Sequence, residues 1–163
     1  MTDTPYILSA GDVAAMPGTP KTHFLNDNAQ RLNKSLGDTT GLSGFGFHLI
    51  EVAPGRETTE YHMHHHEDEC VYVLSGTATA RIGNEEHPIG AGDFIGYRAG
   101  GAAHTILNTG SDVLRCIVVG ARLPHDVGDY PDKGKRILRN AGLPWALVGH
   151  DDVETLGGPV GSK

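Results

Sequence analysis

The chain has 163 residues, of which 38% are hydrophobic and 20% are charged, a composition typical of a globular domain. Lysine and arginine together number 13 against 20 aspartates and glutamates, so the formal net charge is −7. This balance argues against binding to nucleic acid or to an anionic membrane surface, because both need a cationic face. There is no apolar stretch near the roughly 20 residues of a membrane span, no signal-peptide pattern and no disulfide framework. We therefore expect a cytoplasmic protein.

The first 44 residues are expected to form an N-terminal arm. Three prolines favour an extended first half of this segment. A short helix is predicted from Asn26 to about Leu36, because apolar residues recur there at helical spacing and Gly37 follows as a stop.

Residues 45–120 alternate short apolar runs with turn signals, which predicts a series of short β-strands. The predicted strands are Phe45–Val52, Thr58–His64, Cys70–Leu74, Thr77–Ile82, Glu85–Ile89, Phe94–Tyr97, Ala103–Leu107 and Val113–Val119. Gly83-Asn84 is typical of a two-residue hairpin turn, and residues 108–112 are expected to form another hairpin loop. Strands at such close spacing favour an all-β sandwich or barrel over βαβ units.

Residues 121–163 are expected to be a C-terminal extension of the same single domain. Prolines exclude a long helix, although Lys133–Asn140 is compatible with one or two helical turns. The apolar run Leu143–Val148 is expected to pack on the barrel or on a second subunit, and residues 157–163 are expected to fray.

The stretch from His62 to Glu69 holds residue types that bind transition metals. His62 and His64 are two residues apart, and side chains at positions i and i+2 of a strand share a face, so both imidazoles can reach one ion. Glu69 opens the next predicted strand after a turn and can supply a third ligand if the two strands pair. His104, at the head of a later strand, is the best candidate for a fourth ligand.

Three imidazoles and one carboxylate suit one divalent transition metal ion (Zn, Mn, Ni, Co or Fe) better than Ca or Mg. His65, His66 and Glu67 face away from this set or lie in the turn, so we do not expect them to bind the ion. Cys70 and Cys116 are expected to be buried thiols in strands and not ligands.

The spacing of these residues resembles the two motifs of the cupin superfamily. The first motif stands at Gly55, His62, His64, Glu69 and Gly76. The second motif stands at Gly92, Gly100, His104 and Asn108. Each motif contains one gap that is a residue longer than usual, and Arg98 occupies the position of a common proline. The motifs span residues 54–108, with looser resemblance at residues 35–41 and 129–132.

The resemblance implies a cupin jelly roll (a double-stranded β-helix barrel) with short N- and C-terminal extensions and a metal inside one end. It carries over His62, His64, Glu69 and His104 as metal ligands. It also implies that the motif glycines form turns, that Asn108 is structural and that the chain forms a homodimer by sheet extension. Small cupins of this form are often described as similar to sugar-phosphate or mannose-6-phosphate isomerases.

Three functions are compatible with such a site, because the fold does not specify a reaction. The first is a sugar-phosphate isomerase, in which the metal polarises a carbonyl or enediolate oxygen of a small-molecule substrate. The second is an Fe(II)-dependent dioxygenase or a metal-dependent lyase. The third is a non-enzymatic sensor or binding protein for a small ligand.

An isomerase of this type would need further residues around the metal. Candidates for contact with a substrate or its phosphate are Tyr61, Tyr97, Arg98, Arg81 and Arg115. Of the arginines, Arg98 is the most interesting because it replaces a neutral residue at a motif turn. A catalytic base could come from His66 or Glu67, and the sequence selects neither.

Overall fold

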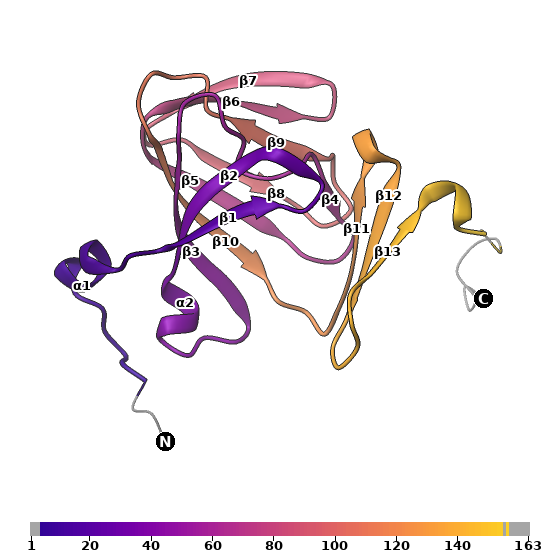
Figure 1. The fold of residues 1–163 in the computed structure, drawn as a ribbon, viewed down its shortest axis with the longest axis horizontal. Coiled ribbons are helices and arrows are strands. Elements are labelled where there is room, and N and C mark those ends of the chain that lie inside the picture. Colours follow the sequence, from indigo (N-terminus) through magenta and orange to yellow (C-terminus); the bar gives the residue numbers. More distant parts are fainter. Residues whose placement is uncertain (1–3, 155, 157–163) are drawn as a thin grey trace.

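The computed structural model describes residues 4–154 and 156, and β-strands dominate this part of the chain (Figure 1). Thirteen strands pair in antiparallel fashion and form sheets of six, four and three strands, which confirms the all-β prediction. The helical segments described are α1 (Ala10–Ala15), α2 (Leu36–Thr39) and two 3-10 turns, Pro131–Lys133 and His150–Asp152. None of the described helices is long and apolar enough to cross a membrane.

The largest sheet has the strand order β1-β2-β3-β10-β5-β8. Its strands are β1 (Thr19–His23), β2 (Asn26–Ser35), β3 (Phe45–Val52), β10 (Leu114–Ala121), β5 (Glu69–Ser75) and β8 (Phe94–Tyr97). The first two of these strands come from the predicted N-terminal arm. They therefore extend the sheet at one edge and form part of its inner face.

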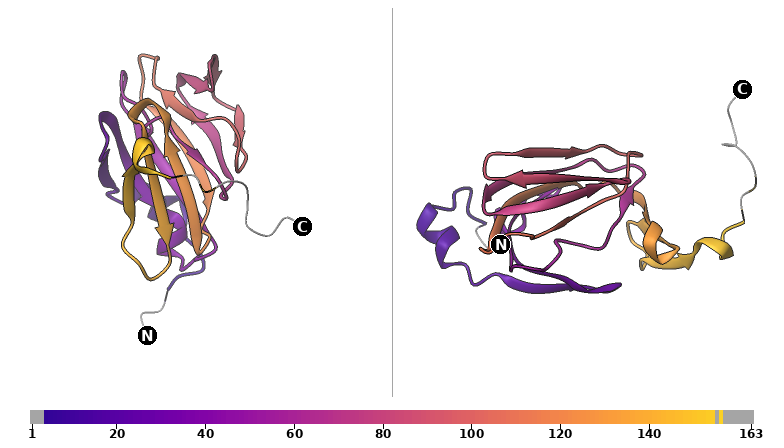
Figure 2. Two further views of the ribbon diagram at one scale, coloured as in Figure 1. Left: turned by 90° about the vertical axis from the view of Figure 1, so that its right-hand side faces the viewer. Right: turned by 90° about the horizontal axis from the view of Figure 1, so that it is seen from above.

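The opposite layer is built from the two smaller sheets. One has the order β13 (Ala146–Gly149), β12 (Lys135–Asn140), β11 (His125–Tyr130) and β4 (Met63–His64). The other has the order β7 (Glu85–Gly90), β6 (Thr77–Ile82) and β9 (His104–Leu107). The backbones of His62 and His104 exchange hydrogen bonds of 3.1 and 2.8 Å, so the two sheets continue into each other. Seen from above, β6 and β7 lie on the opposite side of the molecule from β1 (Figure 2).

The hydrophobic core lies between these layers. Its buried aliphatic and thiol side chains are Ile50, Val52, Val71, Val73, Ala78, Ala80, Ile106, Leu114 and Cys116. Asn108 is buried beside this core, and its amide donates to the carbonyl oxygens of Val52 and Asp112 at 2.8 and 2.9 Å. These bonds satisfy backbone groups where the chain passes from one sheet to the other, which is a structural role.

The four motif glycines have positive φ angles, as turn-forming glycines do. Gly76 shows why the residue is needed: its φ is 89°, and a Cβ atom there would lie 2.9 Å from the Cα of Leu114. A larger residue would be strained by its backbone conformation and would collide with β10.

Both predicted helices in the flanking segments were wrong. Residues Asn26–Ser35 form β2, which pairs with β1 and β3, and Lys135–Asn140 form β12, which pairs with β11 and β13. In each strand an arginine, Arg31 or Arg139, faces the interior cavity and interrupts the apolar alternation that marks a strand. The helical spacing of the remaining apolar residues was therefore misleading.

Two smaller expectations also need correction. The predicted strand Thr58–His64 is regular only at Met63–His64, and its remaining residues are joined to β9 by a single bridge at His62 and the hydrogen bond from the Thr58 N–H to the Ile106 carbonyl oxygen. Residues 108–112 are not a hairpin loop, because β9 pairs with β6 while β10 pairs with β3 and β5.

In the apolar run Leu143–Val148, which was predicted to pack on the barrel or on a second subunit, the Trp145 side chain is 65% exposed although it borders the cavity described below. The fraying expected at residues 157–163 lies outside the described residues.

Candidate functional site

A cavity of about 420 Å³ lies between the two layers. The six-stranded sheet contributes Lys21, Ala29, Arg31, Asn33, His48, Ile50, Val118, Glu69, Val71 and Tyr97 to its wall. The opposite layer contributes His62, His64, His104, Ile106, Tyr130, Ile137 and Arg139. The four predicted metal ligands therefore line one cavity, although they come from both layers.

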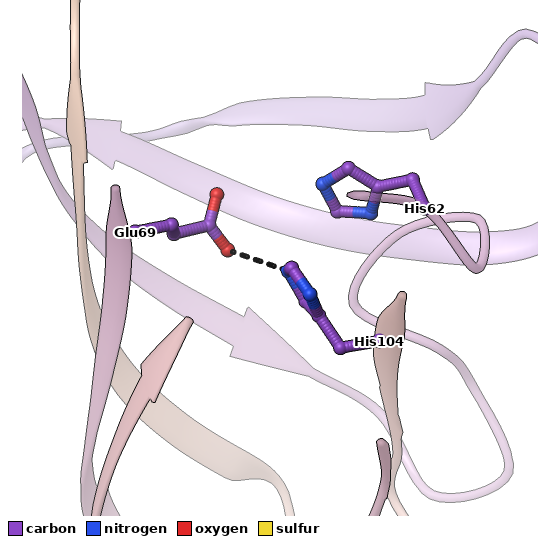
Figure 3. A group of neighbouring side chains, drawn as sticks. All are labelled: His62, Glu69 and His104. Atoms are coloured by element: carbon purple, nitrogen blue, oxygen red, sulfur yellow. Dashed lines mark ion pairs between the residues drawn. The ribbon is translucent and has the colours of Figure 1, made fainter. Parts of the chain in front are cut away.

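Three of those residues, His62, Glu69 and His104, direct their side chains toward one another (Figure 3). The Nε2 atom of His104 lies 3.7 Å from the Glu69 carboxylate, which is too long for a hydrogen bond. It is buried and has no hydrogen-bond partner among the described residues. The His104 ring stacks on Tyr97 with 3.5 Å between ring centroids and 4° between planes, which fixes its orientation. A buried nitrogen that has no hydrogen-bond partner and lies on a ring held in place by stacking is a candidate metal ligand.

His64 completes this group, which we call the imidazole corner (His62, His64, Glu69 and His104). The Nε2 atoms of His62 and His64 lie 3.2 Å apart. Two donors bound to one ion at ~2.0–2.1 Å, with angles of about 90–110° between the bonds, are themselves roughly 2.8–3.4 Å apart. The observed separation therefore suits two nitrogens that share a metal ion.

The other ring nitrogen of each histidine faces an acceptor. The Nδ1 of His62 lies 2.9 Å from the Glu60 carbonyl oxygen, and that of His104 lies 3.3 Å from the Ala102 carbonyl oxygen. The Nδ1 of His64 lies 2.7 Å from a carboxylate oxygen of Asp126. Each acceptor suits a proton on Nδ1, which leaves Nε2 as the ring nitrogen that can bind an ion. This arrangement is the usual support for metal-binding histidines.

The charges of the corner also suit a cation. Burial lowers the pKa of His62 to about 3, so this imidazole is neutral at pH 7. Burial opposes ionisation of Glu69, but His104, then His62 and His64, outweigh it and hold the pKa of the carboxyl at about 2. The corner therefore presents a neutral His62 imidazole and an ionised Glu69 carboxylate at pH 7.

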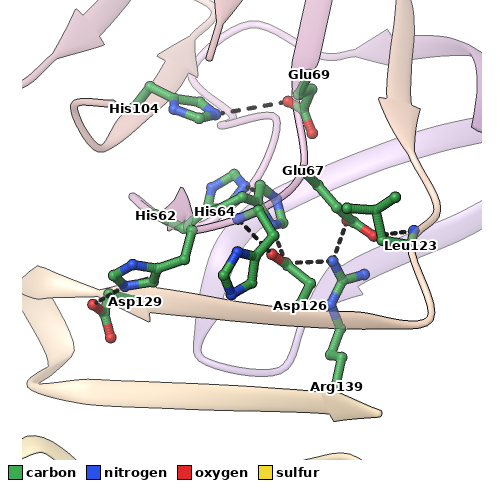
Figure 4. A network of polar contacts seen from close by, with 11 residues as sticks. His62, His64, Glu67, Glu69, His104, Leu123, Asp126, Asp129 and Arg139 are labelled. Carbon is green, nitrogen blue, oxygen red and sulfur yellow. Dashed lines mark hydrogen bonds and ion pairs between the residues drawn. The ribbon is translucent and has the colours of Figure 1, made fainter. Parts of the chain in front are cut away.

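Asp126 is a functional residue that sequence reasoning missed. It lies on β11, 62 residues after His64 in the chain. Its carboxylate also accepts a hydrogen bond of 2.6 Å from the guanidinium of Arg139 on β12 (Figure 4). The same Arg139 nitrogen donates to Glu67, whose other oxygen accepts from the Leu123 backbone N–H at 2.8 Å. Only the fold brings these groups together, and no motif spacing could have found them.

The same network explains why a second group of possible ligands is already satisfied. His64, Glu67 and Asp126 also present ligand atoms close to one another. However, the guanidinium of Arg139 bonds to both carboxylates and supplies the positive charge that a metal would bring. We therefore assign this group to the support of His64 and not to a second metal.

Arg31 and Lys21 form a different part of the wall, which we call the cationic corner. Arg31 lies on β2, directly across from Lys21 on β1, and both side chains border the cavity. Neither residue was among the predicted site residues: Arg31 falls in the segment predicted to be helical, and Lys21 falls in the preceding part of the predicted N-terminal arm. Nearby, burial followed by the charges of Arg31 and Lys133 lowers the pKa of His23 to about 4. His23 is therefore neutral at pH 7.

The residues predicted to contact substrate are distributed unevenly. Tyr97 lines the cavity, whereas Tyr61 is buried elsewhere, with its hydroxyl on the Gly83 carbonyl oxygen at 3.0 Å. Arg98 does not line the cavity but a second hollow, which shares Glu69 and Tyr97 with the cavity wall. The other two arginines pair with carboxylates outside the cavity, Arg81 with Asp132 and Arg115 with Glu51.

The remaining candidates lie outside the cavity wall as well. His65 pairs with Asp129 at 2.8 Å, Glu67 is held by Arg139, and His66 is exposed. Cys116 is fully buried in the core, where burial raises the pKa of its thiol to about 12, and Cys70 is partly buried on β5.

Comparison with known proteins agrees with this fold and cavity. Residues 48–120 match the family described as the cupin domain. A provisionally named sugar phosphate isomerase from Acidithiobacillus ferrooxidans has a similar solved structure, with 49% identity and a TM-score of 0.91 over 94% of this chain and 97% of that chain. A sugar phosphate isomerase of a cupin superfamily from Silicibacter pomeroyi is 29% identical, with a TM-score of 0.72 over 83% of this chain and 87% of that chain. No protein with a curated description matches.

The chain belongs to the cupin superfamily, and its two facing antiparallel layers are the jelly roll of that fold. The resemblance in the two sequence motifs is thereby confirmed. The single-domain boundaries, the homodimer and the cytoplasmic location stay predictions.

Proposed function

We propose that the protein is a metal-dependent enzyme that isomerises a small phosphorylated sugar. His62, His64, Glu69 and His104 are its proposed ligands for one divalent transition metal ion. The observation that carries the proposal is the close grouping of ligand atoms from His62, Glu69 and His104, with the Nε2 of His64 3.2 Å from that of His62. The two similar structures named as sugar phosphate isomerases support the reaction class.

A bound divalent ion would supply Lewis acidity, which stabilises negative charge that develops on a carbonyl or enediolate oxygen. The protein's own residues fix the donor atoms in advance. Tyr97 holds the His104 ring by stacking, and Asp126 holds His64 by its hydrogen bond. Because these supports are rigid, the corner is organised before any ligand arrives.

His23 is the proposed hydrogen-bond donor to the same substrate oxygen. Its Nδ1 accepts from the Leu25 backbone N–H at 3.2 Å, so the ring proton resides on Nε2. The ring lines the cavity and is neutral at pH 7 because burial, then Arg31 and Lys133, lower its pKa to about 4. A neutral imidazole held in this way can polarise a carbonyl oxygen without delivering a full positive charge.

The test is a turnover assay of the purified protein after chelation and reloading with Mn, Zn, Co, Ni or Fe(II). A panel of aldose and ketose phosphates is supplied, and interconversion is followed by NMR. We expect one aldose–ketose or epimer pair to equilibrate with at least one metal. His104→Ala should abolish this turnover, and His65→Ala should retain it, because His65 pairs with Asp129 outside the cavity.

Two results would contradict the proposal. One is the absence of turnover across the panel with every metal, despite one bound ion per chain. The other is consumption of O₂ by the Fe(II)-loaded protein with an oxidised product, which would support the dioxygenase alternative.

A further inference from the structure

We propose that the cationic corner, Arg31 with Lys21, is the subsite that holds the phosphate group of the substrate. This inference rests on the proposed function, because it names the recognition group of the same cavity. It differs from the sequence-based expectation, which sought a phosphate-binding residue at Arg98, Arg81 or Arg115.

The first support is the unmet bonding capacity of Arg31. One Nη1–H donates to the carbonyl oxygen of Thr58 in the opposite layer. The Nε atom is buried and has no hydrogen-bond partner among the described residues. The guanidinium makes no ion pair within 4 Å in the described part of the chain, although it borders the cavity. An arginine that has unused N–H donors and no ion-pair partner can bind an anion through those donors.

The second support is the position of Lys21. The antiparallel register places Lys21 directly opposite Arg31 on the neighbouring strand. Like charges at such positions repel one another and destabilise the strand pair unless an anion lies between or beside them. Lys21 also has no carboxylate within ion-pair distance among the described residues, and the carboxylate whose charge acts on Arg31 is Glu69 of the imidazole corner.

The third support is a contrast with the other cationic residue of the cavity. Arg139 is bonded to the carboxylates of Glu67 and Asp126, which neutralise it. The carboxylate of the cavity wall, Glu69, belongs to the imidazole corner. Two unneutralised cations on adjacent strands match the nearly double negative charge of a phosphate monoester better than the single charge of a carboxylate.

The test measures binding of inorganic phosphate to the metal-free protein by calorimetry, with acetate as the competing anion. Chelation of metal separates this experiment from the proposed metal chemistry. The variants are Arg31→Gln, Arg31→Lys, Lys21→Gln and Arg98→Gln, and circular dichroism together with Mn titration verifies that each is folded. Arg98 is the matched control because it is a cation near the imidazole corner that does not line the cavity wall formed by Arg31 and Lys21.

We expect phosphate to bind the wild-type protein and Arg31→Gln to weaken that binding by about tenfold or more. Arg31→Lys should recover part of the loss, because it keeps the charge without the fork of donors. Lys21→Gln should have a smaller effect of about threefold, since this side chain is exposed. Arg98→Gln should bind phosphate as the wild type does.

The inference would be overturned if Arg31→Gln bound phosphate normally, if Arg98→Gln lost it, or if acetate bound as tightly as phosphate. Failure of the proposed function gives a different pattern. In that case phosphate binding would still depend on Arg31, but neither metal-dependent turnover nor metal binding sensitive to His104 would be found.

Discussion

The two corners of the cavity are prepared in opposite ways. In the imidazole corner, the Nδ1 atom of each histidine is bonded to an acceptor, and ligand atoms of His62, Glu69 and His104 lie close to one another. In the cationic corner, Arg31 and Lys21 lie side by side with no carboxylate partner among the described residues. The first corner has lone pairs and a carboxylate to offer a cation, and the second has N–H donors to offer an anion. A substrate that carries both an oxygen ligand and a phosphate would satisfy both corners.

Removing a proposed ligand is expected to give the largest effect. His104→Ala deletes a nitrogen that has no other partner in the described structure, so the affinity for Mn or Zn should fall by more than about a hundredfold. Calorimetric titration of the chelated protein measures this change. His65→Ala is the control, because His65 bonds to Asp129 and does not line the cavity. Equal affinities in the two variants would remove His104 from the ligand set.

Loss of the hydrogen bond behind a ligand should have the next largest effect. Asp126→Asn weakens the acceptor on His64 Nδ1, and the affinity for metal should fall by about 10–100-fold. Asp129→Asn is a matched control, since Asp129 lies on the same strand and also pairs with a histidine and an arginine, His65 and Arg136. Arg139→Lys provides a second variant if the first does not fold. Similar losses in both aspartate variants would indicate general destabilisation and not support of His64.

The first corner could be predicted from the sequence and the second could not. His62, His64, Glu69 and His104 fall in a region where Gly76, the Gly83-Asn84 turn and short apolar runs mark most of the strand boundaries. The local sequence therefore predicts the strands of that region, and the motif spacing identifies the candidate ligands within them.

Arg31 and Arg139 were missed because charged residues at inward positions disguise the secondary structure of their segments. Each lies at an inward position of a strand, where an apolar residue normally reveals the alternation. Asp126 was missed for a different reason: its pairing with His64 depends on the packing of β11 beside β4. Contacts of that sequence separation follow from the whole fold.

The pH dependence of the free energy of unfolding tests the environment of His23, which borders the cationic corner. The pKa of His23 is about 4 in the folded chain, because of burial and then the charges of Arg31 and Lys133, against about 6.5 when unfolded. As the pH falls from about 6.5 to about 4, the unfolded chain takes up a proton that the folded chain does not. The free energy of unfolding should therefore decrease across this window and level off below it.

His62 contributes to the same trend, so the contribution of His23 is the difference between the wild type and His23→Gln. Denaturant titrations of the metal-free proteins across this pH range measure that difference. The decrease should be shallower in His23→Gln. Parallel stability curves for the two proteins would show that His23 titrates normally in the folded chain.

The smallest effect is expected at Tyr97. Its hydroxyl is buried without a hydrogen-bond partner in the described structure, while its ring stacks on His104. Tyr97→Phe keeps the ring and removes the unsatisfied group, so the free energy of unfolding should change by less than about 1 kcal/mol. Metal affinity should be unchanged, because the stacking is preserved. A large rise in KM with normal metal binding would instead place the hydroxyl on the substrate.

The most direct test of this account is an anomalous difference map from crystals grown with Mn²⁺. The account predicts one peak, bonded to the Nε2 atoms of His62, His64 and His104 and to the carboxylate of Glu69. A peak between Glu67 and Asp126 with Arg139 displaced, or no peak in the cavity at saturating Mn²⁺, would contradict it.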